Sequence, residues 1–386
     1  MALATLMNKT GIYIHIPFCV RKCAYCDFVS YPADAKEVGA YFRALMGIEL
    51  ANAIEFIKSR GRSVETIYIG GGTPTSVDRR HLTSLVRVCM NELPYAGNIE
   101  ITVEMNPGTV DKEYIRALIM AGVSRFSIGV QSFNDETLRF LGRIHSADEA
   151  RRSIRMARGA GCSNLSLDLI YGTPGESLAG LLHSVEKAVS LNPEHLSVYG
   201  LSIPEGTRLY SNLQAGTFEQ TSPEVQREMY EALRETLAMA GYAQYEISSW
   251  ARPGFECRHN LNYWRLGEYL GLGCAASSFI DNVRRKNIDD HREYVRRLEG
   301  MESPIAEQES LSSEQRIEET VMLGLRMREG ICLKSLSERE GYDLLTEKRE
   351  TIDRLLHANL IKIESGYLRL TDEGILVADE VILWLA

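Results

Sequence analysis

The sequence predicts an α/β protein built on a parallel sheet, with a smaller helical module after it. From Gly11 to about Ser202, short runs rich in β-branched and aromatic residues alternate with longer amphipathic stretches, the pattern of βα units. Hydrophobic residues form 45% and charged residues 25% of the 386, as in ordinary soluble globular proteins. At roughly 150 residues per domain, this length corresponds to two or three domains, or to one large barrel with an appendage.

Six strands are expected in the repeating region, with an amphipathic helix after each of the first five. The strands are expected at Gly11–Ile16, Thr66–Ile69, Ile99–Glu104, Arg125–Val130, Leu165–Ile170 and His195–Tyr199. The helices are expected near Ala35–Ser59, Asp78–Asn91, Asp111–Ala121, Ala147–Ala160 and Ser177–Leu191. Six strands are too few for the usual closed barrel of eight. We therefore expect a partial barrel or an open doubly wound sheet, between which periodicity alone does not decide.

The alternation of strand and helix patterns ends after Ser202. A Glu- and Arg-rich helix is expected over Pro223–Ala240, then an aromatic stretch at Tyr242–Trp264 and a polar connection at Asp281–Glu309. The rest of the chain predicts two helices, a hairpin at Leu360–Leu370 and a final helical stretch, the order of a winged helix. We expect three regions: residues 1–220 as the barrel, 221–306 as a connecting region, and 307–386 as a winged-helix-like domain.

The net charge and the distribution of apolar residues indicate which kinds of partner to expect. The formal net charge is −9, and residues 307–386 carry 17 acidic against 10 basic side chains. An acidic field repels nucleic acid, so no nucleic-acid partner is expected, even for the winged-helix-like module. No apolar run approaches the ~20 residues of a membrane span, and Met1–Thr10 is too short for a secretory signal. We expect a cytosolic protein, in which thiols stay reduced.

Three of the eight cysteines are clustered. Cys19, Cys23 and Cys26 form a C-x3-C-x2-C loop directly after the first expected strand, at the mouth where parallel sheets hold cofactors. Three thiolates on one loop select zinc, copper or iron–sulfur, and a structural zinc site requires a fourth ligand. His15 is a candidate, although strand alternation points its side chain elsewhere. Without a fourth ligand the loop indicates an iron–sulfur cluster with one open iron; a zinc knuckle or buried cysteines are the alternatives.

Further polar residues follow the ends of the next strands. The run Gly70–Pro74 (GGGTP) forms a turn whose glycines let the backbone approach a ligand, although an ordinary tight turn explains them equally well. Glu104, Gln131 and Asp168 lie at or near strand ends, and Arg143 can form a bidentate pair with a carboxylate. Buried charges need partners, which are either a ligand's polar groups or an internal salt-bridge network among these residues.

The cysteine spacing is similar to that of the radical S-adenosylmethionine (radical SAM) proteins. Four strings extend the resemblance over nearly the whole chain, to the oxygen-independent coproporphyrinogen III oxidase branch: Tyr13–Cys26, Gly70–Pro74, Gly129–Ser132 and Asp168–Gly172. The resemblance implies a partial (β/α)6 barrel of the radical SAM type, in which the three cysteines bind a [4Fe–4S] cluster. It also implies that S-adenosylmethionine chelates the open iron and that an electron from the cluster can cleave it to a 5′-deoxyadenosyl radical.

By the same resemblance, two groups of residues surround S-adenosylmethionine. One binding position is implied for Tyr13, Gly71 and Glu104. A second position, which is occupied in the oxidase, is implied for Gly72, Thr73, Gln131, Arg143 and Asp168.

The chain departs from the oxidase at three places, where it resembles the sister group, the heme chaperones. The oxidase has a fourth cysteine two residues after the third. This chain has Asp27-Phe28 there, as in the chaperone loop C-x3-C-x2-C-x-F, which adds Phe28 to the implied cofactor-binding residues. Only 18 residues precede Cys19, whereas the oxidase has a long N-terminal arm. The string His259–Trp264 (HNLNYW) resembles the heme-binding motif of the chaperones.

The resemblance implies that the protein binds heme near His259 and passes it to an unidentified acceptor protein. A neutral imidazole can ligate heme iron and flanking aromatic rings can stack on the macrocycle, although a single His among aromatics is more often a packed core residue. Cys257 is an alternative heme ligand. The alternative function is the oxidase reaction, a radical decarboxylation of coproporphyrinogen III in heme biosynthesis. The four remaining cysteines are expected as core thiols: Cys89, Cys162, Cys274 and Cys332.

Overall fold

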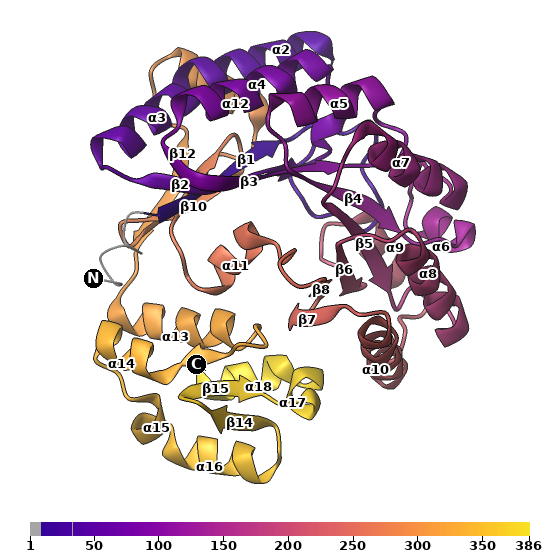
Figure 1. Cartoon of the computed structure of the whole chain (residues 1–386), viewed down its shortest axis with the longest axis vertical. Helices are drawn as coiled ribbons and strands as arrows, with labels where there is room; N and C mark the ends of the chain where they lie inside the picture. Colours follow the sequence, from indigo (N-terminus) through magenta and orange to yellow (C-terminus); the bar gives the residue numbers. More distant parts are fainter. Residues whose placement is uncertain (1–8, 33) are drawn as a thin grey trace.

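The computed structural model describes residues 9–32 and 34–386, and its centre is a curved, mostly parallel sheet (Figure 1). All six expected strands are present, and each lies parallel to the next. They are β1 (Lys9–Ile16), β2 (Ser63–Gly71), β3 (Tyr95–Met105), β4 (Arg125–Gln131), β5 (Leu165–Tyr171) and β6 (His195–Gly200).

The two faces of this sheet differ in polarity. On the outer face, alternate residues such as Ile12, Ile14 and Ile67 are buried beneath helices. On the inner face, by contrast, the strands present polar side chains. They include Thr66, Tyr68, Thr102, Glu104, Ser127, Asp168 and Ser197. The interior of a closed eight-stranded barrel is filled with branched apolar residues. A polar interior therefore indicates that this barrel encloses a ligand site.

Helices cover the outer face between successive strands, as the βα rhythm predicts (Figure 1). They are α2 (Ala35–Ala44), α3 (Leu50–Ser59), α4 (Arg79–Glu92), α5 (Lys112–Ala121), α6 (Asp135–Phe140), α7 (Ala147–Ala160) and α8 (Leu178–Ser190). The single helix expected over Ala35–Ser59 is interrupted by a π-helical segment, Leu45–Glu49. Glu49 in this segment accepts hydrogen bonds from the amide of Gly273 (2.7 Å) and the hydroxyl of Tyr294 (2.5 Å). The π segment thus connects the helix to a distant part of the chain. The periodicity of the local sequence does not predict this connection.

Strands from the later part of the chain extend both edges of the parallel region. Beside β6 lie β8 (Ser249–Ala251) and β7 (Ala243–Glu246), both antiparallel to their neighbours. Beside β1 lie β9 (Tyr269–Leu272), which is parallel to it, and then β10 (Ser277–Ile280), β11 (Val283–Asn287) and β12 (Ile305–Ser310). The complete order of the twelve strands is β12-β11-β10-β9-β1-β2-β3-β4-β5-β6-β8-β7.

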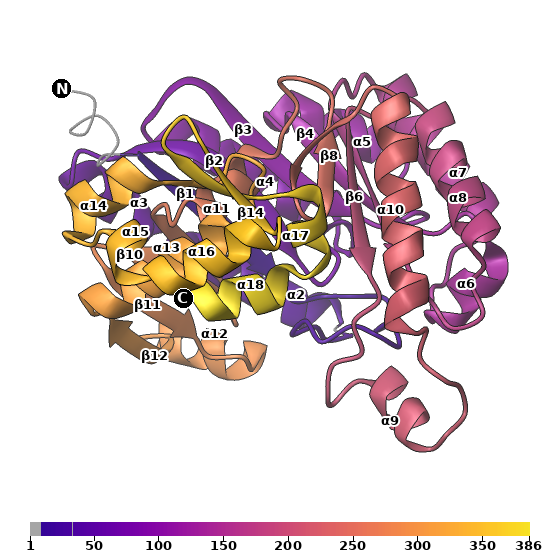
Figure 2. The same ribbon diagram turned by 90° about the horizontal axis from the view of Figure 1, so that it is seen from below.

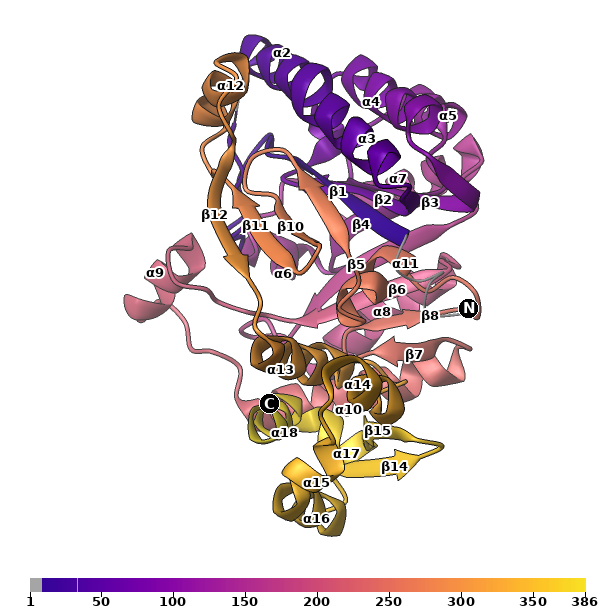
Figure 3. The same ribbon diagram turned by 90° about the vertical axis from the view of Figure 1, so that its left-hand side faces the viewer.

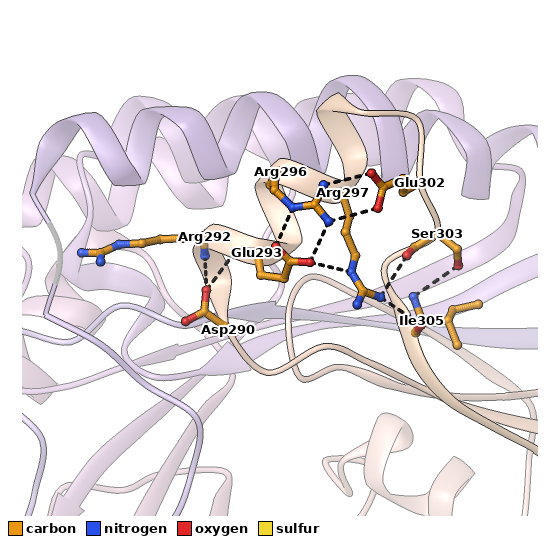
Figure 4. Close-up of polar contacts among 8 residues, drawn as sticks. All are labelled: Asp290, Arg292, Glu293, Arg296, Arg297, Glu302, Ser303 and Ile305. Carbon is orange, nitrogen blue, oxygen red and sulfur yellow. Dashed lines mark hydrogen bonds and ion pairs between the residues drawn. The ribbon is translucent and has the colours of Figure 1, made fainter.

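The expectation of a polar connection at Asp281–Glu309 is wrong. This segment forms β11, helix α12 (His291–Glu299) and β12. Its charged residues form ion pairs along regular structure (Figure 4): Glu293 pairs with Arg296 and with Arg297. Arg297 also donates to the carbonyl of Ile305 at 3.4 Å, which connects α12 to the start of β12.

Three helices lie between β6 and β9 in the chain. Helix α9 (Arg208–Gln214) projects from the body, and α10 (Pro223–Met239) packs against α8 (Figure 2). Helix α11 (Arg258–Trp264) follows β8 and lies inside the arc of the sheet, against β2 (Figure 1). The aromatic stretch Tyr242–Trp264 therefore contains the last two strands at one end of the sheet and the helix that fills the open side of the partial barrel.

The C-terminal part is a separate layer of helices with a small antiparallel sheet (Figure 3). Its helices are α13 (Ser313–Gly324), α14 (Leu333–Glu340), α15 (Leu344–Glu347), α16 (Arg349–His357), α17 (Asp372–Leu376) and α18 (Ala378–Leu385). Its strands are β13 (Ile331–Cys332), β14 (Ile361–Glu364) and β15 (Tyr367–Leu370), in the order β13-β15-β14. The expected hairpin is confirmed, and its turn residues Ser365 and Gly366 both have positive φ (+52° and +81°), as a tight two-residue hairpin turn requires.

No helix within residues 9–32 and 34–386 is long and apolar enough to cross a membrane. The expectation about Met1–Thr10 concerns a segment of which the structure describes only Lys9 and Thr10. These two residues begin β1.

Candidate cofactor site

A cavity of about 380 Å³ opens at the carboxyl ends of the parallel strands. The loop after β1, the ends of β2 to β6 and the start of α11 form its walls. All the predicted site residues line it except Tyr13 and His259. Those that do are Cys19, Cys23, Cys26, Phe28, Gly71, Gly72, Thr73, Glu104, Gln131, Arg143 and Asp168.

Backbone hydrogen bonds hold the cysteine loop at its ends and in its middle. The amide of Cys19 donates to the carbonyl of Tyr31 at 3.1 Å, which joins the start of the loop to its end. The amide of Ala24 donates to the carbonyl of Leu141 (3.0 Å), and the carbonyl of Ala24 accepts from the amide of Leu209 (2.8 Å). The loop is thus clamped between the end of α6 and the start of α9, and its thiols are presented by a constrained backbone.

Two of the three thiols have polar neighbours. Cys19 Sγ lies 3.4 Å from Thr73 Oγ1, and Arg143 Nη1 donates to Cys23 Sγ at 3.3 Å. Burial raises the pKa of Cys19, and it raises the pKa of Cys26 to about 11. Buried thiols of this kind become thiolates when a metal centre binds them, because coordination displaces the proton.

The donor set fits an iron–sulfur cluster better than a single metal ion. Within the described part of the chain, no group of three or more Cys, His, Asp or Glu side chains converges closely enough to hold one ion. A [4Fe–4S] cluster takes one thiolate on each ligated iron, so cysteines that stand apart around a cavity suit it. Gly72 keeps the space beside the loop open, because a Cβ there would lie 3.1 Å from Cys19 Sγ and 2.8 Å from the carbonyl oxygen of Phe18.

Glu104 is held at the cavity wall by two donors. The hydroxyl of Tyr68 donates to it at 2.8 Å and the amide of Gly71 at 3.2 Å. Burial raises the pKa of Glu104 to about 7. Gly71 has a φ of +112°, and a Cβ there would lie 2.7 Å from the ring of His15, so this position requires glycine. The arrangement can bind an ammonium group or accept hydrogen bonds from ribose hydroxyls.

Arg143 connects the cysteine loop with the ends of β3 and β4. Besides its thiol contact, its guanidinium donates to Asn106 Oδ1 and to the carbonyl of Gly129 (2.7 Å). Asn106 in turn donates to the hydroxyl of Thr73 at 2.7 Å. Gln131, at the end of β4, has a φ of +67°, an uncommon conformation for a residue with a side chain and one found at functional sites.

Asp168 and Arg125 lie deeper in the barrel. The hydroxyl of Ser127 approaches both carboxylate oxygens of Asp168, at 3.0 and 3.1 Å, and burial raises the pKa of Asp168. Arg125 lines the cavity although it is only 2% exposed. Its Nε has no hydrogen-bond partner among the residues that the structure describes. A buried cation of this kind sets the electrostatic potential of the cavity floor.

Tyr13 does not line the cavity. Its hydroxyl lies 2.9 Å from His15 Nδ1, and its ring stacks on that of Tyr68 with centroids 6.4 Å apart. His15 Nε2 lies 2.9 Å from the carbonyl oxygen of Val29. Both ring nitrogens of His15 therefore have partners away from the thiols, which agrees with the direction expected from strand alternation.

His259 is fully buried beside the cavity, and its neighbour Asn260 reaches the wall. Its Nδ1 lies 2.7 Å from the hydroxyl oxygen of Thr66, and its Nε2 lies 2.8 Å from that of Tyr263. Burial lowers the pKa of His259 to about 3, so the imidazole is neutral. In this conformation it has the packing of a core histidine, the alternative that its aromatic surroundings suggested.

Sequence reasoning missed several polar residues of the barrel interior. Tyr68 and Asn106 lie two residues from Gly70 and Glu104, so the alternation of a strand could have placed them on the same face. Thr66 and Arg125 begin two of the expected strands, each four residues before a motif that does not include them. The arc of strands brings them to the barrel interior.

Two known protein families together match most of the chain. The radical SAM superfamily matches residues 13–188, and the HemN C-terminal domain matches residues 311–377. The structure of coproporphyrinogen III oxidase (HemN) from Escherichia coli aligns with a TM-score of 0.82 at 20% identity, covering 98% of this chain and 90% of that one. This likeness shows the same fold. The match to the radical SAM superfamily, together with the cysteine loop at the barrel mouth, defines a radical SAM protein, whose cofactors are a [4Fe–4S] cluster and S-adenosylmethionine.

Sequence relatives define the family more closely. The heme chaperone HemW of Bacillus subtilis is 36% identical over 370 residues, which cover 96% of this chain and 97% of that protein. HemW of Mycobacterium tuberculosis is 35% identical over 373 residues, 96% of this chain and 93% of that one. HemW of Escherichia coli is 42% identical over 269 residues, 69% of each. The chain belongs to the HemW family of radical SAM proteins, which confirms the resemblance drawn from its motifs.

Proposed function

We propose that this protein is a heme chaperone, which binds heme at α11 around His259 and transfers it to an acceptor protein. The observation that carries the proposal is the similarity, over 96% of the chain, to a protein named heme chaperone HemW. The motif His259–Trp264 lies within the matched length and on a single helix, α11. No membrane or nucleic-acid partner is part of the proposal.

The cavity supports a role for the cysteine loop in holding the cluster. Cys19, Cys23 and Cys26 would bind three irons, and S-adenosylmethionine would lie against Gly71 and Glu104. When bound, these cofactors supply one-electron chemistry at the barrel mouth. The protein's own groups have simpler tasks: Arg143 orients the Cys23 thiol, Glu104 attracts the cationic part of the ligand, and the glycine turn lets the backbone approach it. A volume of about 380 Å³ is within the range of small-molecule sites.

A heme titration followed by the Soret band tests the proposal. The wild-type protein is expected to bind heme, and His259→Ala is expected to bind it at least about tenfold more weakly, because the iron loses its axial ligand. His195→Ala is the matched control. His195 is equally buried, with its ring nitrogens 2.8 Å from the hydroxyls of Ser166 and Tyr245. Equal heme affinity in wild type and His259→Ala, with equal iron and sulfide content, contradicts the assignment of the ligand.

The second candidate function is the oxidase reaction. The observation in its favour is the fold shared with coproporphyrinogen III oxidase. Incubation with coproporphyrinogen III, S-adenosylmethionine and a strong reductant under anaerobic conditions distinguishes the two functions. We expect no decarboxylated product by chromatography, and turnover that Cys23→Ala abolishes would establish the oxidase instead.

A further inference from the structure

Contacts from three elements hold His259 in place. Thr66 of β2 and Tyr263 of α11 each place a hydroxyl against one ring nitrogen, at 2.7 and 2.8 Å. Glu100 of β3 accepts the amide of His259 at 3.2 Å and the amide of Arg258 at 3.3 Å. These bonds bind both the side chain and the start of α11 to the interior of the barrel.

We propose that Thr66 and Glu100 form a latch that keeps His259 closed, while Tyr263 of the same helix occupies the second ring nitrogen, and that heme ligation requires α11 to leave the barrel interior. The inference rests on the proposed function and names the residues that set its heme affinity. Heme iron needs the lone pair of a ring nitrogen, and each ring nitrogen faces a hydroxyl in the closed conformation. The side chain is also fully buried, so a flat macrocycle cannot reach it while α11 is in place.

The surroundings of His259 are shaped for the closed conformation. A Cβ on Gly11 would lie 3.2 Å from His259 Cε1 and 3.3 Å from its Nδ1, so the imidazole packs directly on the backbone of β1. On another side the ring of Tyr68 stacks on the imidazole, with centroids 5.3 Å apart. Helix α11 has seven residues, too few for stability of its own. Its position therefore depends on contacts with neighbouring elements, which include Thr66 and Glu100 and also the carbonyl of Asn98, which accepts from Arg258 at 2.8 Å.

His195 provides an internal comparison. It repeats the pattern of a buried histidine between two hydroxyls, those of Ser166 and Tyr245. Its backbone, however, belongs to β6, which pairs with β5 on one side and β8 on the other. The same side-chain chemistry is thus present once on a strand held from both sides and once on a short helix. Only the helix can move without breaking the sheet.

The latch has a quantitative consequence. When the closed conformation dominates, the apparent heme affinity equals the intrinsic affinity multiplied by the fraction of open molecules. Loss of one buried hydrogen bond of the closed state raises that fraction about fivefold, and more when it leaves the partner nitrogen unpaired. Weakening the latch therefore tightens heme binding, whereas loss of an ordinary structural contact does not.

Heme titrations and association kinetics test the latch with Thr66→Val and Tyr263→Phe, which remove a hydroxyl and preserve shape. Thr66→Val, which removes a hydrogen bond between α11 and β2, is expected to bind heme about fivefold more tightly than wild type and to associate faster. Tyr263→Phe, which removes a hydrogen bond within α11, is expected to change the affinity less. Ser166→Ala, which removes the equivalent hydroxyl beside His195, is expected to leave the affinity unchanged. Unchanged or weaker binding in Thr66→Val, with heme binding intact in wild type, overturns the latch alone. Absence of heme binding in all four proteins overturns the chaperone proposal as well.

A second measurement needs no substitution. Hydrogen exchange of the backbone amides of wild type, with and without heme, reports whether α11 leaves the barrel. Heme is expected to remove the protection of the His259 and Arg258 amides, which donate to Glu100, while the amides of α10 keep theirs. Persistent protection of both amides in the heme-bound protein overturns the latch.

Discussion

At the scale of single residues, the cavity wall combines buried acids with a few well-placed donors. Glu104 illustrates the consequence. Its pKa is raised from 4.5 to about 7 because burial disfavours the charged form more than Tyr68 and Gly71 stabilise it. Between these two values the unfolded chain releases a proton that the folded protein keeps, so this group makes the unliganded fold less stable as the pH rises from 4.5 to 7. A cationic ligand stabilises the ionised carboxylate of Glu104 and thereby offsets this loss of stability.

The first prediction concerns the pH dependence of S-adenosylmethionine binding. The ligand carries positive charge and prefers ionised Glu104, so below pH 7 binding must expel a proton. The affinity is expected to fall as the pH is lowered from about 7 to about 5.5, by up to tenfold per unit. Calorimetry in buffers of different ionisation enthalpy measures both the affinity and the released proton. Glu104→Gln is expected to bind more weakly and without this pH dependence; a flat profile in wild type contradicts the role of Glu104.

At the scale of elements, the cysteine loop depends on two segments far from it in the sequence. Leu209 of α9 packs with Ala24, Leu141 and Ile170 in one apolar cluster and also donates its amide to Ala24. Gly142 has a φ of +74°, and a Cβ there would lie 3.1 Å from the amide nitrogen of Ala24. The position of the thiols is therefore set by the packing of α6 and α9 around Ala24 as well as by the loop itself.

The second prediction tests this dependence with Leu209→Ala. Removal of a buried leucine side chain is expected to destabilise the packing around Ala24 by about 2–4 kcal/mol and to loosen the loop. Iron and sulfide retained per chain after anaerobic reconstitution are expected to fall. Leu336→Ala, at an equally buried position of α14, is the control, because it lowers the thermal stability of the C-terminal part without changing cluster content. Equal iron content in both variants contradicts a role for α9 in holding the loop.

At the scale of the whole molecule, the acidic C-terminal part is joined to the barrel by backbone pairing and ion pairs. The amide of Arg328 donates to the carbonyl of Tyr245 at 3.0 Å, and Asp372 pairs with both Arg328 and Arg234. Exposed ion pairs of this kind contribute about 0–1 kcal/mol each. Arg234 belongs to α10 and Arg328 to the C-terminal part, so Asp372 connects the two parts through its pair with Arg234.

The third prediction follows from this distribution of charge. Although a helical module with a β-hairpin resembles a DNA-binding shape, a net excess of acidic side chains repels the phosphate backbone. No change in fluorescence anisotropy of a labelled duplex of about 30 base pairs is expected at physiological salt, with protein up to about 10 μM. A salt-sensitive increase in anisotropy within that range contradicts the expectation that the acidic charge prevents binding of nucleic acid.

Local sequence patterns were sufficient to predict an element wherever the interactions that form it are local. The strands β1 to β6 follow from alternating burial, the terminal hairpin from the positive-φ pair Ser365-Gly366, and the cluster loop from the spacing of three cysteines. Strand β11 could not be recognised, because its charged run Val283–Asn287 is stabilised by pairing with β12 and not by an apolar face.

The packing of His259 shows most clearly what could not be predicted from the sequence. Its motif was visible in the sequence, and the family confirmed the resemblance. Its packing partners were not visible, because Thr66 and Glu100 lie 193 and 159 residues away along the chain. Residue type and spacing establish which chemistry a side chain can perform. Whether its lone pairs are free depends on which hydroxyl and carboxylate groups the folded sheet brings against it, and that is a property of long-range packing.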